Sequence, residues 1–359
     1  MNRRAFITLS KSNLILNITR IKELVQKAKI VSMIKSNAYG HGLEEVGHCL
    51  EGYTDLLGVR SLEEAFTLSK QGIKTPLLLA QGIRNSYELI EASKNHFHVV
   101  IHNHNQIEWL QTLSLPSPIT CWLKINTGMN RLGFNTDDGD IIYAQLKNNK
   151  NIKDIILMSH FACAETKEHP LNKEQITIFK KHTDHLSVPR TMSNSAAIFN
   201  FPECHFDYVR PGIALYGISP IPEKSSLELG LKPIMTFYSS LICVKTVTKG
   251  STVGYTARYT CPETMPVGII GCGYADGYPL TLTDGAPVLI RDTICPIIGR
   301  ISMDMIAVDL RNVPAAKIDD TVIMWGEDLS LDNIVPYTGQ SSYTILAGMI
   351  SNVPYEWIL

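Results

Sequence analysis

The chain has 359 residues, of which 45% are hydrophobic and 19% are charged, and its formal net charge is −1. A chain of this length and composition is expected to fold into two soluble globular domains, which excludes a disordered or fibrous protein. A net charge so close to zero provides no field for nucleic acid or an anionic membrane, so we expect neither as a partner.

From about residue 10 to residue 230, short apolar runs alternate with amphipathic stretches. Arg4–Leu9 is strand-like, Ser10–Lys29 has apolar residues at helical spacing behind a candidate Ser10 cap, and Ile30–Lys35 is short and β-branched. Further strand-like runs lie at Leu56–Val59, Leu77–Ala80, His98–Ile101, Cys121–Ile125, Ile155–His160, Pro189–Ser193 and Asp207–Arg210. Helical stretches begin at Leu43 and include Leu62–Lys70, Asn85–Ser93, Gln106–Leu113 and Lys173–Leu186.

Eight strand-like runs separated by helices predict a parallel sheet, and eight is the number that closes into a (β/α)8 barrel of the TIM type. An open, doubly wound sheet is the alternative. No GxGxxG motif opens the first helix, and its absence favours the barrel.

After Leu231 the sequence changes to short runs separated by Gly, Pro and Asp, which is typical of an all-β domain. We expect residues 10–233 to form the barrel and residues 234–359 the C-terminal β domain. Residues 1–9 are expected to form a strand that joins the β domain. The runs that predict its strands are Phe237–Thr248, Val267–Gly271, Pro287–Ile290, Thr293–Ile298, Met305–Leu310 and Thr321–Trp325.

The N-terminus and the cysteines indicate the cellular compartment. No apolar run near Met1 is long enough for a secretory signal, and none elsewhere reaches the roughly 18 residues of a membrane span. The eight cysteines are scattered without a CxxC pair, which suits neither a zinc site nor a disulfide framework. We therefore expect a cytoplasmic protein without a bound metal.

Polar side chains stand at the ends of several predicted barrel strands, where the reactive groups of such barrels lie. Lys35 ends the first run, Lys124 and His160 fall near the ends of the fifth and sixth, and Arg210 ends the eighth. A lysine that is buried at a strand end has a lowered pKa and can form a Schiff base. The alternative for any one such lysine is plain exposure at the barrel rim.

Three loops made of small residues favour the reactive interpretation. Ser36–Gly42 follows Lys35, and Met192–Ser195 and Arg210–Ile213 follow the last two strands, where many barrels bind phosphate through backbone amides. A lysine, a phosphate cup and an arginine together predict a pocket for pyridoxal phosphate.

Six motifs closely resemble those of the alanine racemase family, and they occur in the family's order. They are Lys35-Ser-Asn-Ala-Tyr-Gly-His-Gly, Asn126-Thr-Gly-Met-Asn-Arg-Leu-Gly133, Arg210-Pro-Gly-Ile213, Gly254-Tyr255, Gly273-Tyr-Ala-Asp-Gly-Tyr-Pro279 and Gly299-Arg-Ile-Ser-Met-Asp304. The resemblance implies an enzyme that interconverts L-alanine and D-alanine on pyridoxal phosphate and supplies D-alanine for peptidoglycan.

The resemblance also implies the catalytic groups. Lys35 would bind the cofactor and act as the base for D-alanine. Tyr255, from the other subunit of a homodimer with shared active sites, would be the base for L-alanine. Racemisation requires acid–base groups on both faces of a planar intermediate. His160, backed by Arg210, would lower the pKa of Tyr255.

The same resemblance implies the binding residues. Arg210 would donate to the pyridine nitrogen, and Arg131 would contact the phenolic oxygen and the substrate. The backbone of Met303 would receive the substrate carboxylate. The lysine that matches Lys124 is often carbamylated in the family, and the modified side chain would position Arg131. The phosphate and the rest of the cofactor would be held by Tyr39, His160, Asn194, Ser195, Gly212 and Ile213.

Four positions depart from the family pattern. Asn126 replaces an aspartate, Thr256 replaces a glycine after the catalytic tyrosine, Leu280 replaces an arginine, and Asn352 replaces an arginine before Val-Pro. No tyrosine directly precedes Asn352 that could join the phosphate cup. These departures bear on rate, cofactor affinity and the charge of the active-site mouth.

Other functions remain as alternatives at this stage. A broader racemase would accept serine, although such enzymes are often exported. A non-catalytic pyridoxal-phosphate protein would lack the β domain, and a cofactor-free aldolase would not need the phosphate cup. A related decarboxylase would be expected to carry an acidic partner for the pyridine nitrogen, and Arg210 argues against it. Taken singly, Tyr255, His160 and Met303 could be ordinary turn or core residues.

Overall fold

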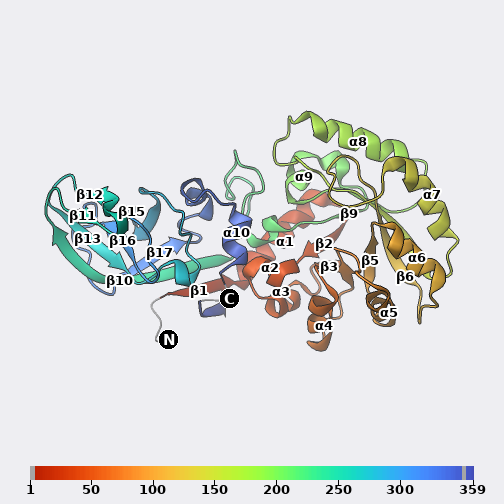
Figure 1. The fold of residues 1–359 in the computed structure, drawn as a ribbon, viewed down its shortest axis with the longest axis horizontal. Helices are drawn as coiled ribbons and strands as arrows, with labels where there is room; N and C mark the ends of the chain where they lie inside the picture. The colour runs from red at the N-terminus through yellow and green to blue at the C-terminus, as the bar shows by residue number, and fades with distance from the viewer. Residues whose placement is uncertain (1–4, 350–352) are drawn as a thin grey trace.

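The computed structural model describes residues 5–349 and 353–359 and shows an elongated molecule with two lobes (Figure 1). One lobe is a closed parallel barrel surrounded by helices, and the other is a β domain, so the predicted fold class is confirmed. Arg4 and the departure at Asn352 lie outside the described residues. No helix in the described ranges is long and apolar enough to cross a membrane.

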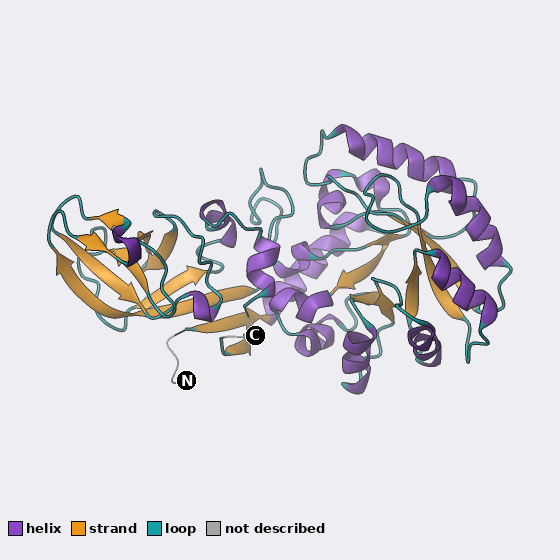
Figure 2. Ribbon diagram, in the orientation of Figure 1, coloured by secondary structure: helices purple, strands orange, loops and turns teal. Residues whose placement is uncertain are grey.

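Eight parallel strands close the barrel in sequence order, inside a ring of helices (Figure 2). The strands are β2 (Lys29–Met33), β3 (Leu56–Val59), β4 (Leu77–Leu79), β5 (His98–Ile101), β6 (Ile119–Lys124), β7 (Ile152–Met158), β8 (Arg190–Thr191) and β9 (Tyr208–Val209). The helices are α1 (Lys11–Val25), α2 (Lys35–Gly40), α3 (Leu43–Leu50), α4 (Leu62–Lys70), α5 (Ser86–Lys94), α6 (His104–Thr112), α7 (Thr136–Lys147), α8 (Pro170–Thr183) and α9 (Ser195–Asn200), with short 3-10 turns η1 (Pro202–Cys204) and η2 (Ile213–Tyr216).

Most of these helices begin where the sequence supplies an oxygen for the unpaired first-turn amides. Ser10, as predicted, caps α1 by accepting from the amide of Asn13 at 3.2 Å. Ser61 and Asn85 cap α4 and α5 in the same way. The last two barrel strands are only two residues long, shorter than the predicted runs, because the chain leaves the ladder for the loops that reach the pocket.

The barrel interior is a separate apolar core. Alternate residues of each strand point inward, and nine of them pack together, with Trp122 fully buried among them. The outward residues pack against the helices and belong to a larger core that continues into the β domain. The inward set is Val31, Met33, Leu56, Leu78, Val100, Trp122, Ile156, Met158 and Tyr208.

The β domain is built on an eight-stranded sheet that a pairing between β10 (Met235–Val247) and β13 (Met265–Ile270) closes on itself. The first strand of the chain joins this sheet, antiparallel to β10 and parallel to the last strand. The domain also contains α10 (Ser342–Ala347), η3 (Tyr255–Ala257), η4 (Tyr274–Asp276), η5 (Leu331–Asn333) and η6 (Val335–Tyr337). Its strands are β1 (Phe6–Ser10), β10 (Met235–Val247), β11 (Thr252–Val253), β12 (Tyr259–Thr260), β13 (Met265–Ile270), β14 (Pro287–Ile290), β15 (Thr293–Ile298), β16 (Ile306–Asp309), β17 (Thr321–Trp325) and β18 (Tyr355–Ile358).

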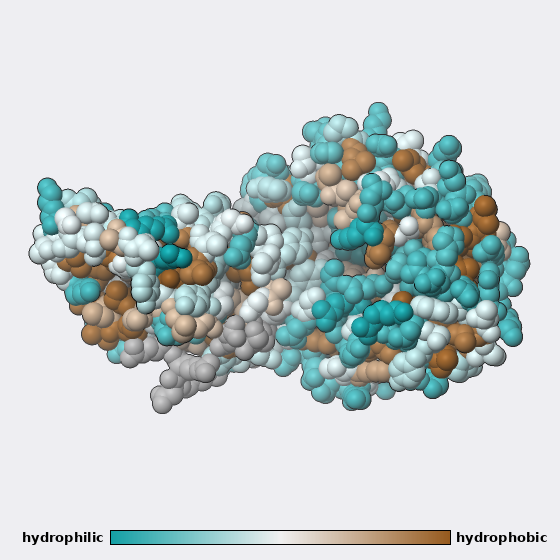
Figure 3. All heavy atoms as spheres, in the orientation of Figure 1, coloured by the Kyte–Doolittle hydropathy of each residue, from teal (hydrophilic) through white to brown (hydrophobic). Residues whose placement is uncertain are grey.

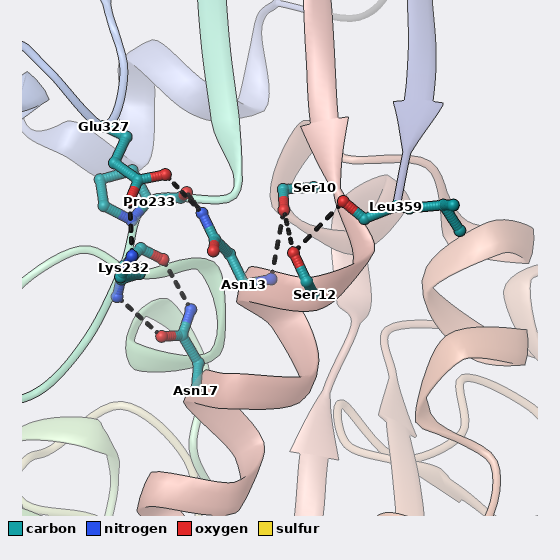
Figure 4. A network of polar contacts seen from close by, with 8 residues as sticks. All are labelled: Ser10, Ser12, Asn13, Asn17, Lys232, Pro233, Glu327 and Leu359. Atoms are coloured by element: carbon teal, nitrogen blue, oxygen red, sulfur yellow. Dashed lines mark hydrogen bonds and ion pairs between the residues drawn. The ribbon is translucent and has the colours of Figure 1, made fainter.

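A polar network fixes the junction between the two lobes (Figure 4). The buried Asn17 of α1 donates to the carbonyl of Lys232 at 2.8 Å and accepts from its amide at 2.8 Å. Asn13 donates to the carbonyl of Pro233, and Lys232 pairs with Glu327 of the β domain. The segment between the domains is therefore held against α1 by its own backbone, which fixes the direction in which the chain enters β10.

Candidate active site

The polar residues at the carboxyl end of the barrel continue the inward-facing register of its core. Each of them stands two positions after a residue of that core. The pairs are Met33 and Lys35, Trp122 and Lys124, Met158 and His160, and Tyr208 and Arg210. Only Lys124 lies on its strand; Lys35, His160 and Arg210 lie just beyond the last ladder residues of β2, β7 and β9, not on the strands as predicted. All four line one cavity above the apolar core, at the end of the barrel where reactive groups are expected.

A cavity of about 1050 Å³ opens above this layer. Its wall continues onto the loop after η2 and onto α10, which packs beside α2 between the lobes (Figure 1). Lys124 lines it, together with nine residues expected from the sequence to bind the cofactor: Lys35, Tyr39, Arg131, His160, Asn194, Ser195, Arg210, Gly212 and Ile213.

The loop after Lys35 is a left-handed helical turn. Ser36, Asn37, Ala38 and Tyr39 all have φ between 52° and 56°. This conformation costs about 1–2 kcal/mol for each residue with a side chain, so the surroundings must hold it in place. The ring of buried His41 does so from the end of the turn, because its Nδ1–H donates to the carbonyl oxygens of Ala38 at 3.2 Å and Tyr39 at 3.1 Å.

Arg210 is buried and held by four acceptors. One terminal nitrogen donates to the Thr191 hydroxyl, and the other donates to the carbonyls of Ser159 at 2.6 Å and Met192 at 3.2 Å. The second nitrogen also donates to Nδ1 of His160 at 3.1 Å, which places the proton of that ring on Nε2. Burial and the nearby Arg210 charge hold the pKa of His160 well below its usual value, so this histidine is neutral.

The pocket has an excess of positive charge. Burial, together with Arg210, Arg131 and Lys35, lowers the pKa of Lys124 to about 8. Burial and Arg131 also lower the pKa of Lys35, which increases the fraction of neutral, nucleophilic amine. Within the described ranges, no carboxylate forms an ion pair with any of these four groups. An anionic ligand would compensate this charge.

A second part of the wall carries hydroxyl and backbone groups from the loops after β2, β8 and β9. The Ser195 hydroxyl accepts from the amides of Gly212 at 2.8 Å and Ala214 at 3.3 Å, so its own hydrogen is left to donate into the cavity. A Cβ atom at Gly212 would lie 2.5 Å from the Tyr39 hydroxyl, so only glycine leaves this space beside the tyrosine. Hydroxyl and backbone groups of this kind suit phosphate oxygens.

Tyr255 and Met303 do not line the cavity of their own chain. They lie on the β domain with 67% and 53% of their surface exposed. Apolar residues also reach the surface of this lobe in the space-filling view (Figure 3). The three C-terminal motifs nevertheless meet, because Gly254 packs against Arg300 and the amide of Ala275 donates to the carbonyl of Met303 at 3.0 Å.

Three of the four departures can be assessed in the structure. Thr256 has φ of 62°, a conformation that glycine adopts without strain, which explains why glycine suits this position. Asn126 accepts from the amides of Gly128 and Asn130, so it still forms the turn without the charge of an aspartate. Leu280 is exposed.

Sequence reasoning missed Tyr343. It lies on α10, lines the same cavity, and its ring centre is 6.1 Å from that of Tyr39. No tyrosine directly precedes Asn352, as noted from the sequence, but Tyr343 reaches this wall from an earlier position. The residue stands nine positions before Asn352, and only the packing of α10 on α2 brings it to the pocket.

Comparisons with known families agree along the whole chain. The family model described as "Alanine racemase, N-terminal domain" matches residues 9–220, and "Alanine racemase, C-terminal domain" matches residues 234–357. The alanine racemase of Coxiella burnetii (strain CbuG_Q212) is 40% identical over 358 residues, 98% of each chain. That of Legionella pneumophila (strain Lens) is 37% identical over 99% of this chain and 100% of the relative.

Solved structures give the same result. The biosynthetic alanine racemase from Pseudomonas aeruginosa superposes with a TM-score of 0.96 at 35% identity, over 99% of this chain and all of the other. The alanine racemase from Bartonella henselae with covalently bound pyridoxal phosphate has a TM-score of 0.88 over 99% of each chain. Its identity of 24% makes that likeness one of fold alone.

Proposed function

The chain belongs to the alanine racemase family, and we propose that its pocket interconverts L-alanine and D-alanine with pyridoxal phosphate as cofactor. The reaction supplies D-alanine for peptidoglycan. The observation that carries the proposal for the site is the convergence of nine residues, from distant parts of the barrel sequence, on one cationic cavity.

The chemistry of the cavity fits this cofactor. The four cationic groups suit a dianionic phosphate ester and a phenolate, and Ser195 and Gly212 form a cradle for the phosphate beside Tyr39. Tyr343 faces the same part of the wall and would add a hydroxyl. When bound, pyridoxal phosphate withdraws electrons from the α-carbon of an amino acid, so that its proton can be removed.

Lys35 would hold the cofactor covalently and move a proton on one face of the α-carbon. Its lowered pKa suits both tasks, because only the neutral amine can attack a carbonyl or accept a proton. Arg210 remains protonated at neutral pH although burial lowers its pKa to about 9. Its terminal nitrogens contact Thr191, Ser159, Met192 and His160, whereas no group among the described residues accepts from Nε–H, which would donate to the pyridine nitrogen.

Proton transfer on the opposite face would come from Tyr255 of the partner subunit. Tyr255 is exposed on the β domain and absent from the cavity wall of its own chain. We therefore propose a homodimer in which the β domain of one subunit closes the barrel mouth of the other. Met303 of the partner subunit would bring its backbone to the substrate carboxylate, and His160 would exchange a proton with the partner's Tyr255.

The remaining expectations form part of the same proposal. We propose a cytoplasmic enzyme, since the eight cysteines are free thiols in the described structure. We also propose that residues 10–233 act as the cofactor-binding unit, with residues 1–9 and 234–359 as the unit that meets the partner. The pairing of β1 with β10 supports this division.

The assignment of Lys35 can be tested by borohydride reduction of the cofactor-loaded protein and peptide mass spectrometry. We expect the added mass on the peptide that contains Lys35, and none on that peptide in the Lys35→Ala variant, which should also lose racemisation. Lys124, the other buried lysine of the cavity, is the internal control. Attachment at Lys124, or racemisation by Lys35→Ala, would remove Lys35 from its proposed role.

A further inference from the structure

The carboxylate of Glu64 contacts the left-handed turn that follows Lys35. Its Oε1 accepts from the amide of Ser36 at 2.8 Å and from that of Asn37 at 3.4 Å. Its Oε2 accepts from the amide of Arg60 at 2.7 Å. None of the roles described above uses Glu64, although it lies beside the lysine on which they depend.

The local sequence explains why a carboxylate stands there. Ser61-Leu-Glu-Glu64 has the pattern of a capping box, and the Ser61 hydroxyl accepts from the amide of Glu64 as such a cap does. In a capping box the glutamate reaches back to the amide of the cap residue, but here it serves Arg60 and the neighbouring turn instead. Strand β3 lies directly beside β2, which brings the start of α4 within reach of Ser36.

The two amides bound by Glu64 are the ones that the turn itself cannot satisfy. The amide of Ala38 bonds to the carbonyl of Ile34 at 2.9 Å, as in any helical turn. The amides of Ser36 and Asn37 come before that bond and have no partner inside the turn. A carboxylate that accepts both of them favours this strained conformation over an extended loop, and so it fixes the direction in which Lys35 leaves β2.

The charge of Glu64 acts on the Lys35 amine as well. The groups that face this amine are the ring of Tyr39, with its centre 6.0 Å from Nζ, and Arg131, Lys124 and His160. Burial and Arg131 lower the pKa of Lys35, whereas Glu64 raises it. The negative charge of Glu64 therefore partly offsets the effect of burial and of Arg131 on the pKa of the Lys35 amine.

We propose that Glu64 is a positioning residue for Lys35, which holds the left-handed turn by its two amides and balances the charge around the amine. The consequence for cofactor binding rests on the proposed function, in which Lys35 carries the cofactor. The contacts with Ser36 and Asn37 do not depend on it.

Two measurements on the full chain test the proposal in Glu64→Gln and Glu64→Ala. The first is the pH profile of Lys35 acetylation by acetic anhydride without added cofactor, followed by mass spectrometry of the Lys35 peptide. The second is the dissociation constant of pyridoxal phosphate, measured by absorbance. Glu63→Gln is the matched control, because Glu63 stands one position earlier on α4 and points to solvent, where it pairs with the exposed Arg84.

We expect the acetylation midpoint of Glu64→Gln to move to lower pH, since the charge that favours the ammonium form is gone. Pyridoxal phosphate should bind roughly tenfold more weakly, as expected for the loss of hydrogen bonds to a charged acceptor. Glu64→Ala should lose more affinity, and Glu63→Gln should match the wild type in both measurements. If Glu64→Ala does not fold, the glutamine variant decides.

The proposal is wrong if Glu64→Gln has the same acetylation midpoint and the same cofactor affinity as Glu63→Gln. A failure of the wild type to bind pyridoxal phosphate would instead overturn the proposed function. The acetylation profiles would still report on Glu64 in that case, so the two failures can be told apart.

Discussion

Buried ionisable side chains determine how the cavity behaves. His41 is fully buried, stacks on Tyr216 with ring centres 4.5 Å apart, and keeps its proton on Nδ1 for the carbonyls of the left-handed turn. Its Nε2 is buried without a partner among the described residues. Burial lowers the pKa of His41 to about 4, so the ring stays neutral into acid and its unpartnered Nε2 stays unprotonated.

The pKa of His41 links stability to pH. Between about pH 6.5 and 4 the unfolded chain binds a proton that the folded chain excludes, so stability falls as pH decreases through this window. The change amounts to about 3 kcal/mol at its acid end. Phenylalanine cannot titrate, so the free energy of urea unfolding of His41→Phe should depend less on pH between 7 and 4.5. The difference in slope should correspond to about one proton fewer taken up on unfolding.

The control for this slope is His48→Gln, because His48 lies on the neighbouring α3 with 49% of its side chain exposed. A slope in His41→Phe equal to those of the wild type and His48→Gln would contradict the buried neutral state of His41.

Tyr255 gives a prediction about the two faces of the substrate. With the roles proposed above, Lys35 of the Tyr255→Phe variant would still remove and return the proton of D-alanine, but no base would act on L-alanine from the other side. We expect D-alanine to exchange its α-hydrogen with solvent deuterium, L-alanine to exchange much more slowly, and racemisation to be lost. Tyr87→Phe, at a tyrosine of similar exposure on α5, should behave as the wild type. Equal exchange of both enantiomers would argue against the assignment of Tyr255.

At the level of secondary structure, a glycine allows η2 to pack closely against the segment between the domains. Gly217 ends η2 with φ of 77°, and a Cβ atom there would overlap the carbonyl oxygen of Lys232 in the segment between the domains. Together with Asn17, this contact holds the segment that leads into β10.

Gly217→Ala should therefore lower the free energy of unfolding by more than about 2 kcal/mol, from backbone strain and overpacking together. Gly72→Ala is the matched control, since Gly72 has φ of 85° but no atom within 4 Å of a Cβ at that position. It should cost only about 1 kcal/mol, the strain alone. Equal losses in urea unfolding would mean that the segment moves aside freely.

The alternation of strands and helices was predictable because each barrel element buries a face with its own periodicity. The same register placed Lys35, Lys124, His160 and Arg210 above the barrel core. The left-handed turn after Lys35 was not predictable, since residues such as Asn and Tyr do not require it and only contacts from α4 and His41 impose it. Tyr343 was missed because the local sequence around it does not show that α10 packs against α2.

At the scale of the whole molecule, the two lobes carry two halves of the proposed site that do not meet in one chain. The barrel contributes the cationic cavity, whereas Tyr255 and Met303 face outward from the β domain. Exposed apolar residues on this lobe, including Tyr274 and Met305, are expected of a surface that meets another subunit.

Subunit mixing tests this sharing of sites. In a dimer of one Lys35→Ala and one Tyr255→Phe subunit, one site has both defects and the other has none. Random mixing of the two inactive variants should thus restore on the order of one quarter of the sites. Activity should rise to about that fraction of the wild type after the subunits exchange. No recovery, with exchange shown by native mass spectrometry of isotope-labelled subunits, would assign Tyr255 to its own chain or to no site.

The proposed function is tested most directly by a chiral assay of the purified protein with pyridoxal phosphate, with L-alanine and L-serine supplied in parallel. We expect L-alanine to become an equal mixture of enantiomers and serine to be inverted much more slowly. Serine inverted as fast as alanine would indicate a broader racemase. No inversion of either, in protein that carries the cofactor on Lys35, would contradict the proposed function.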